Sequence, residues 1–133
     1  MWCAVHRSNL AWSDLTKQVS EVKRLITDAR EVAKYFHTSG IRTAELHKIT
    51  ESLLVTLERF PDYFEIRWTE YVHSLLNTLF SNWHPLIKYV KSRSAIDAEC
   101  RGFVKVWTEV GQLKLMVFLL DVLMKYSRFQ KRL

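Results

Sequence analysis

The scarcity of glycine and proline is the feature that most constrains how this chain can fold. Only three glycines and two prolines occur in 133 residues, of which 48% are hydrophobic. Both residues are unfavourable in helix interiors, whereas a fold of many short strands needs them in its turns. Apolar residues also recur at spacings of three and four over residues 22–36, as they do on one face of a helix. The chain is therefore predicted to be all-α.

We expect an irregular bundle of about five to six helices, interrupted by one extended segment near residues 55–67. Residues in this segment favour extended backbone, and Pro61 disfavours helical geometry immediately before it. Pro85 is expected to kink the helix that follows. The last helix, residues 112–132, is apolar almost all round as far as Phe129, which predicts that it is central and largely buried.

Charge is distributed unevenly along the chain. The formal net charge is +6, and residues 101–133 hold seven basic and two acidic residues, a net charge of +5. A basic surface of this kind can bind nucleic acid, because it neutralises phosphates and releases their counterions. A solvated helical face without a ligand is the alternative interpretation.

Cysteine content and hydropathy indicate the compartment. Cys3 and Cys100 alone cannot form the disulfide framework of a small secreted domain, so a reducing compartment is expected. The first residues lack the basic and apolar regions of a signal peptide. The most apolar run, residues 115–120, is far shorter than the roughly 18 residues of a membrane span. We expect a soluble intracellular chain that does not enter a membrane.

Cys3 and His6 are the first candidate site residues. They lie three positions apart, so a helix would place both on one face, and both residue types can bind zinc. A structural zinc ion needs four ligands, however, and the other cysteine and histidine residues offer no second pair at ligand spacing. We therefore predict no metal site, and a buried thiol beside a hydrogen-bonded histidine instead.

Arg67 and Trp68 are the second candidate pair, because they end the extended segment just before a helix. A tryptophan at such a junction is expected to act as a hydrophobic plug. The functional alternative is a stacking platform for an unpaired base, with the arginine holding a phosphate.

Asp121 is unusual because it lies within an apolar run. A carboxylate in such a run needs a partner, and Lys125, four residues later on a helix, is the expected one. No glycine-rich phosphate loop and no nucleophile–base spacing is recognisable elsewhere. No enzyme active site is therefore predicted.

Three segments, taken in order, resemble one family. Residues 3–10 read C-x-x-H-x-x-N-L, residues 60–69 contain the Arg-Trp pair, and residues 118–130 place an aspartate in an apolar run before Ser127 and Gln130. Together they resemble the C-x-x-H-x-L-N-L segment, the R-W motif and a later helix of hAT-superfamily transposases and of host proteins derived from them.

The resemblance implies an RNase H-like core that is interrupted by a large helical insertion. It places residues 1–68 at the edge of that core and in its lead-in, and residues 69–133 among the insertion helices. We expect residues 1–133 to form a single helical domain.

The resemblance also implies roles for the four candidate site residues. These roles are proximity to the active site for Cys3 and His6, and contact with a DNA end for Arg67 and Trp68. The carboxylates that hold two Mg²⁺ ions in such enzymes would lie on either side of these 133 residues. Catalysis is therefore not expected, and Mg²⁺ would be required only by a full-length relative.

We accordingly expect a non-catalytic fragment of a transposase-derived protein that is nuclear and binds DNA ends or other nucleic acid. It is expected to need no cofactor and no small-molecule substrate. Two alternatives stay open. One is a helical module for protein–protein interaction or homo-oligomerisation, and the other is a decayed transposon remnant without activity.

Overall fold

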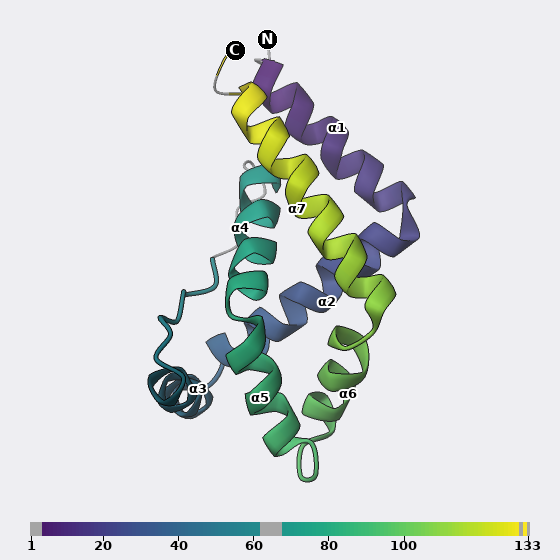
Figure 1. The fold of residues 1–133 in the computed structure, drawn as a ribbon. Coiled ribbons are helices and arrows are strands. Elements are labelled where there is room, and N and C mark those ends of the chain that lie inside the picture. The colour runs from purple at the N-terminus through teal and green to yellow at the C-terminus, as the bar shows by residue number, and fades with distance from the viewer. Residues whose placement is uncertain (1–3, 62–67, 131, 133) are drawn as a thin grey trace.

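The chain folds as seven helices over the residues that are described. The computed structural model describes residues 4–61, 68–130 and 132, and these residues contain no strand (Figure 1). The helices are α1 (Ala4–Gln18), α2 (Ser20–His37), α3 (Gly40–Ser52), α4 (Trp68–Ser81), α5 (Trp83–Arg93), α6 (Ala98–Trp107) and α7 (Val110–Gln130). The predicted all-α class is confirmed.

α2 crosses the molecule, and the other helices pack against one side of it or against each other (Figure 1). α4 and α5 follow one another along one side, and α6 and α7 run back along the other (Figure 1). α1 lies beside α7, where the rings of Trp12 and Tyr126 pack with their centroids 5.4 Å apart. Contacts join α2 to α1, α3, α4 and α7.

The apolar stripe of α2 is the centre of the hydrophobic core, as its spacing predicts. Its buried side chains are Leu25, Ala29, Val32, Ala33, Tyr35 and Phe36. The Phe36 ring extends the core towards Phe60 and Tyr89, at centroid distances of 6.4 and 5.5 Å. Leu76 of α4 and Leu123 of α7 are buried in the same cluster. Residues on both sides of position 68 therefore contribute to one core.

Asn82 separates α4 from α5 and explains why there are more helices than the five to six expected. Its side chain is 1% exposed. The Asn82 amide nitrogen donates to the Glu58 carbonyl (2.8 Å), and the Glu58 N–H donates to Asn82 Oδ1 (3.3 Å). The helix is interrupted here and not at Pro85, because Pro85 lies in the first turn of α5, where a backbone N–H is not needed. Asn82 thus ties the segment after α3 to the core.

The segment after α3 begins with a leucine in the left-handed conformation. Leu54 has φ 57°, and its N–H donates to the Glu51 carbonyl (3.2 Å), while the Val55 N–H donates to the Thr50 carbonyl (3.1 Å). These two bonds form a Schellman motif, in which glycine usually occupies the left-handed position. Residues 55–61, the described part of the predicted extended segment, are not helical.

α7 is not the central, largely buried helix that its composition predicts. One face is buried through Met116, Leu119 and Leu123. The opposite face is in solvent, and there Phe118 and Phe129 are 64% and 55% exposed. The prediction was wrong because α7 packs at the edge of the bundle, where helices cover one of its sides only.

The length and apolarity of the helices bear on whether any of them could span a membrane. Over the described ranges, none is both long enough and apolar enough to span a bilayer.

Replacing Asn82 tests whether this residue holds the 53–61 segment. We expect Asn82→Ala to lower the free energy of unfolding by about 2 kcal/mol, because two hydrogen bonds of a buried side chain are lost. Chemical denaturation measures the change. The matched control is Asn77→Ala on the exposed side of α4, which should change stability by less than about 0.5 kcal/mol. Equal effects of the two substitutions would contradict the assigned role.

Replacing Leu54 with glycine should stabilise the protein. Its side chain is 94% exposed, so little packing is lost, and glycine removes the Cβ strain at positive φ. We expect a gain of about 1 kcal/mol in the free energy of unfolding. Leu53, one residue earlier, has φ −92°, and Leu53→Gly should lower stability instead. A loss of stability in Leu54→Gly would show that its backbone conformation is not strained.

Candidate nucleic-acid interface

The outward face of α2 is basic. Lys23, Arg30, Lys34 and His37 are exposed, and their spacings of seven, four and three place them on one side of the helix. At a rise of 1.5 Å per residue, this row extends about 21 Å from Lys23 to His37. The buried apolar stripe occupies the other side, so α2 is strongly amphipathic.

Two neighbouring hollows lie along this basic face. The first, of about 190 Å³, lies between α1, α2 and α4, and the second, of about 460 Å³, lies beside α2 and Pro61. Thr27, Arg30 and Tyr71 line both hollows, so the two adjoin each other. We call this feature the α2 groove, and the residues that matter for its chemistry are Lys17, Lys23, Thr27, Arg30, Glu31, Lys34, His37, Trp68 and Tyr71.

The charge lining the α2 groove is predominantly positive. Among the described residues that line it, four are lysine or arginine and one, Glu31, is acidic. The basic side chains come from both α1 and α2, with Lys17 on α1 facing the same hollow as Lys23. Cationic side chains converging on a groove attract a polyanion more strongly than the same charges on a convex face.

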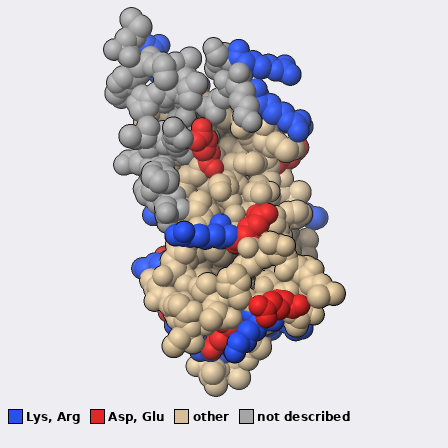
Figure 2. Space-filling model, turned by 90° about the vertical axis from the view of Figure 1, so that its left-hand side faces the viewer, with Lys and Arg blue, Asp and Glu red and all other residues tan. Residues whose placement is uncertain are grey.

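Other parts of the surface carry mixed charge. Figure 2 shows basic and acidic side chains interspersed over the lower part of the face that it displays. Five of the seven basic residues of the last third, which the sequence singles out, are distributed over α6 and α7. Two of them are engaged locally, since Arg101 donates to the Ser94 carbonyl (2.9 Å) and Lys125 pairs with Asp121 (3.0 Å). The predicted Asp121–Lys125 ion pair is confirmed, on an exposed face of α7.

Trp68 is the one predicted site residue whose side chain is described. It begins α4, is 9% exposed and forms part of the wall of the smaller hollow. This burial fits the hydrophobic plug, and stacking on a base would require the ring to leave the core. Arg67 and Cys3 lie outside the described residues, as does the side chain of His6, whose backbone belongs to α1. Their predicted roles stay predictions.

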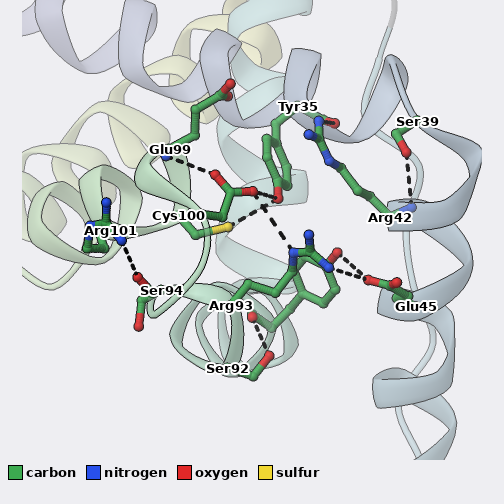
Figure 3. A network of polar contacts seen from close by, with 12 residues as sticks. Tyr35, Ser39, Arg42, Glu45, Ser92, Arg93, Ser94, Glu99, Cys100 and Arg101 are labelled. Atoms are coloured by element: carbon green, nitrogen blue, oxygen red, sulfur yellow. Dashed lines mark hydrogen bonds and ion pairs between the residues drawn. The ribbon is translucent and has the colours of Figure 1, made fainter.

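A separate polar network joins four helices on the other side of α2 (Figure 3). The Tyr35 hydroxyl of α2 donates to Asp97 Oδ2 (2.6 Å), and the Cys100 thiol of α6 donates to the Tyr35 oxygen (3.2 Å). Asp97 also caps α6 by accepting from the Glu99 N–H (3.0 Å). Arg93 Nε of α5 lies 4.0 Å from Asp97 Oδ2, which is an electrostatic contact and not a hydrogen bond.

A second branch of this network reaches α3. Glu45 Oε2 accepts from the Tyr89 hydroxyl (2.6 Å) and from Arg93 Nη1 (3.2 Å). The guanidinium of Arg42 lies over the Tyr35 ring, 3.8 Å from its centroid, and donates to the Tyr35 carbonyl (3.1 Å). Arg93 therefore connects the two branches, as Figure 3 shows.

The protonation states of the network indicate a structural role. Burial raises the pKa of the Cys100 thiol and, together with the bond to Asp97, raises the pKa of the Tyr35 hydroxyl. Burial and the bond to Glu45 raise the pKa of Tyr89 to about 12. At neutral pH these groups keep their protons, whereas a cysteine nucleophile must be a thiolate. The network thus holds helices together and offers no activated nucleophile.

The described part of the chain contains no evident metal-binding site. Its histidine, cysteine and acidic residues form no group of three or more that could hold a metal ion. Cys100 is a buried free thiol.

Comparison with known proteins assigns the chain to no family. No protein-family model matches the chain, and no solved structure matches it significantly. The resemblance to hAT transposases therefore rests on the three sequence segments.

The Asp97 carboxylate should make stability depend on pH. The Tyr35 hydrogen bond holds the pKa of Asp97 below its ordinary value, so its charged form stabilises the fold above about pH 4, and this contribution is lost as the pH falls further. We expect Asp97→Ala to lower the free energy of unfolding by about 2 kcal/mol at pH 7. Asp97→Asn, which retains a cap, should cost less.

Urea denaturation of both variants at pH 7 and at about pH 2 measures this dependence. The difference between the wild type and Asp97→Asn should shrink at the lower pH, because Asp97 is then neutral in both states of the wild type. A difference that stays constant would contradict the lowered pKa of Asp97.

Proposed function

We propose that this chain is a non-catalytic, transposase-derived helical module that binds DNA ends or other nucleic acid through the α2 groove. The observation that carries the proposal is the convergence of Lys17, Lys23, Arg30 and Lys34 on one groove of a chain whose net charge is +6. The three hAT-like segments favour the same class of ligand. A nuclear location follows from this proposal.

The geometry of the groove suits a phosphate backbone. Its basic row extends about 21 Å along α2, and a strand of duplex DNA carries one phosphate per roughly 3.4 Å of axis. The three lysine and arginine side chains of the row, from Lys23 to Lys34, are spread over about 17 Å, so the row can contact a few phosphates of one strand but not every consecutive one. Lysine and arginine contacts of this kind bind without regard to sequence.

The aromatic residues of the groove add a feature that a simple basic patch lacks. Tyr71 lines both hollows and Trp68 lines the smaller one, next to Lys17 and Lys23. Bases stack on aromatic rings in many proteins that bind single strands. Trp68 and Tyr71 are only 9% and 7% exposed, however, so a base could stack on them only after the rings had moved out of the core. The proposal therefore rests on the basic side chains.

Salt-dependent binding tests the proposal. Fluorescence anisotropy with a labelled single-stranded oligonucleotide should show affinity that falls steeply with salt concentration. Removing Lys23 and Lys34 together by alanine substitution should reduce the slope of log K against log salt by about 1.4, which is about 0.7 for each lost phosphate contact.

The control uses two basic residues from the last third of the chain. Lys105→Ala with Lys114→Ala removes the same charge from α6 and α7 and should leave the slope unchanged. Equal losses in both double variants would show that net charge alone drives binding, and the α2 groove would then have no special role. Absence of binding by the wild type at low salt would overturn the proposal itself.

A further inference from the structure

A pocket of about 380 Å³ lies where the end of α2, the first half of α3 and residues 57–60 meet. Among the described residues that line it, only His37 also lines the α2 groove. Small-molecule sites in proteins are concave, mostly apolar and usually about 300–1,000 Å³ in volume. The pocket therefore has the size of a site for a small ligand.

The buried walls of the pocket are apolar and largely aromatic. Phe36 of α2, Leu46 of α3 and Phe60 belong to the core. The Phe36 and Phe60 rings are nearly parallel, with an angle of 15° between their planes, and the His37 ring stands edge-on to Phe60 at 81°. Aromatic rings prefer offset and edge-to-face contacts of this kind. Such walls favour a planar aromatic ligand over an aliphatic one.

The rim of the pocket carries its polar groups. His37, His47, Glu58 and Arg59 line the pocket and are exposed. A neutral imidazole has one donor and one acceptor nitrogen, so either histidine can bond to a polar group on a ligand. Glu58 and Arg59 carry opposite charges, and an apolar interior penalises a buried ion. The pocket therefore suits a neutral ring with a hydrogen-bonding group at its edge.

The walls of the pocket are held in place without a ligand. The backbone of Glu58, in the outer wall, makes two hydrogen bonds with the buried side chain of Asn82. The Thr43 hydroxyl donates to the Phe36 carbonyl (3.0 Å), which fixes the start of α3 against the end of α2. A ligand that enters a preformed pocket avoids the entropic cost of ordering its walls.

We propose that this pocket binds a small, neutral, planar aromatic molecule, of the size of a bicyclic heteroaromatic ring. The ring lies against the apolar walls and its polar edge bonds to a histidine of the rim. The walls that would hold the ring lie outside the α2 groove, so this proposal is independent of the one on nucleic acid.

Titration with 5-fluoroindole tests the proposal in the absence of nucleic acid. This probe is a neutral bicyclic ring with an N–H donor at its edge, and the shift and width of its single fluorine NMR signal report the bound fraction. A ligand of this size should bind the wild type with a dissociation constant of about 1 mM or tighter.

Two substitutions fill the pocket from different walls. Gly40 lies in the first turn of α3, and a Cβ there would meet no atom within 4 Å, so Gly40→Leu should fold. Leu57→Trp enlarges the side chain on the outer wall. Each should weaken binding by about tenfold or more, because the new side chain takes volume that the ring needs.

The matched control is Gly102→Leu. Gly102 is also a helical glycine whose Cβ would meet no atom within 4 Å, but it lies in α6 and does not line this pocket. This variant should bind 5-fluoroindole as the wild type does. Circular dichroism confirms that each variant is folded.

Three outcomes would each overturn the proposal. The first is a wild type that does not bind 5-fluoroindole at about 5 mM probe. The second is unchanged affinity in a folded Gly40→Leu or Leu57→Trp variant. The third is a loss of affinity in Gly102→Leu equal to that in Gly40→Leu, which would place the probe elsewhere on the protein.

Discussion

Burial of the apolar side of α2 is the interaction on which the rest of the structure depends. Leu25 and Ala29 are fully buried there, and Ala33 is 5% exposed. α1, α3, α4 and α7 all contact this helix. Because one side of α2 is used for packing, its polar residues are confined to the other side, and this confinement produces the continuous basic row. The core and the candidate interface thus have one cause.

Polar contacts supplement this core where apolar packing is interrupted. Asn82, the single residue between α4 and α5, makes two bonds to the Glu58 backbone. Asp97 satisfies the start of α6 while accepting from Tyr35 of α2. Both side chains connect segments that are distant in sequence. A buried polar group with good partners costs little to keep and much to lose, because its partner is then left unpaired. Such groups specify how the helices are arranged more than they add to stability.

The sequence predicted features within single helices better than it predicted how the helices pack against each other. Periodicity identified the stripe of α2 and the ion pair of Asp121 with Lys125, because both depend on spacing within one helix. It failed for α7, since composition does not reveal how many neighbours a helix has. The α2 groove was missed although Lys23, Arg30, Lys34 and His37 recur at helical spacing. Its other walls come from α1 and α4, and which helices meet is decided by packing that a single sequence does not display.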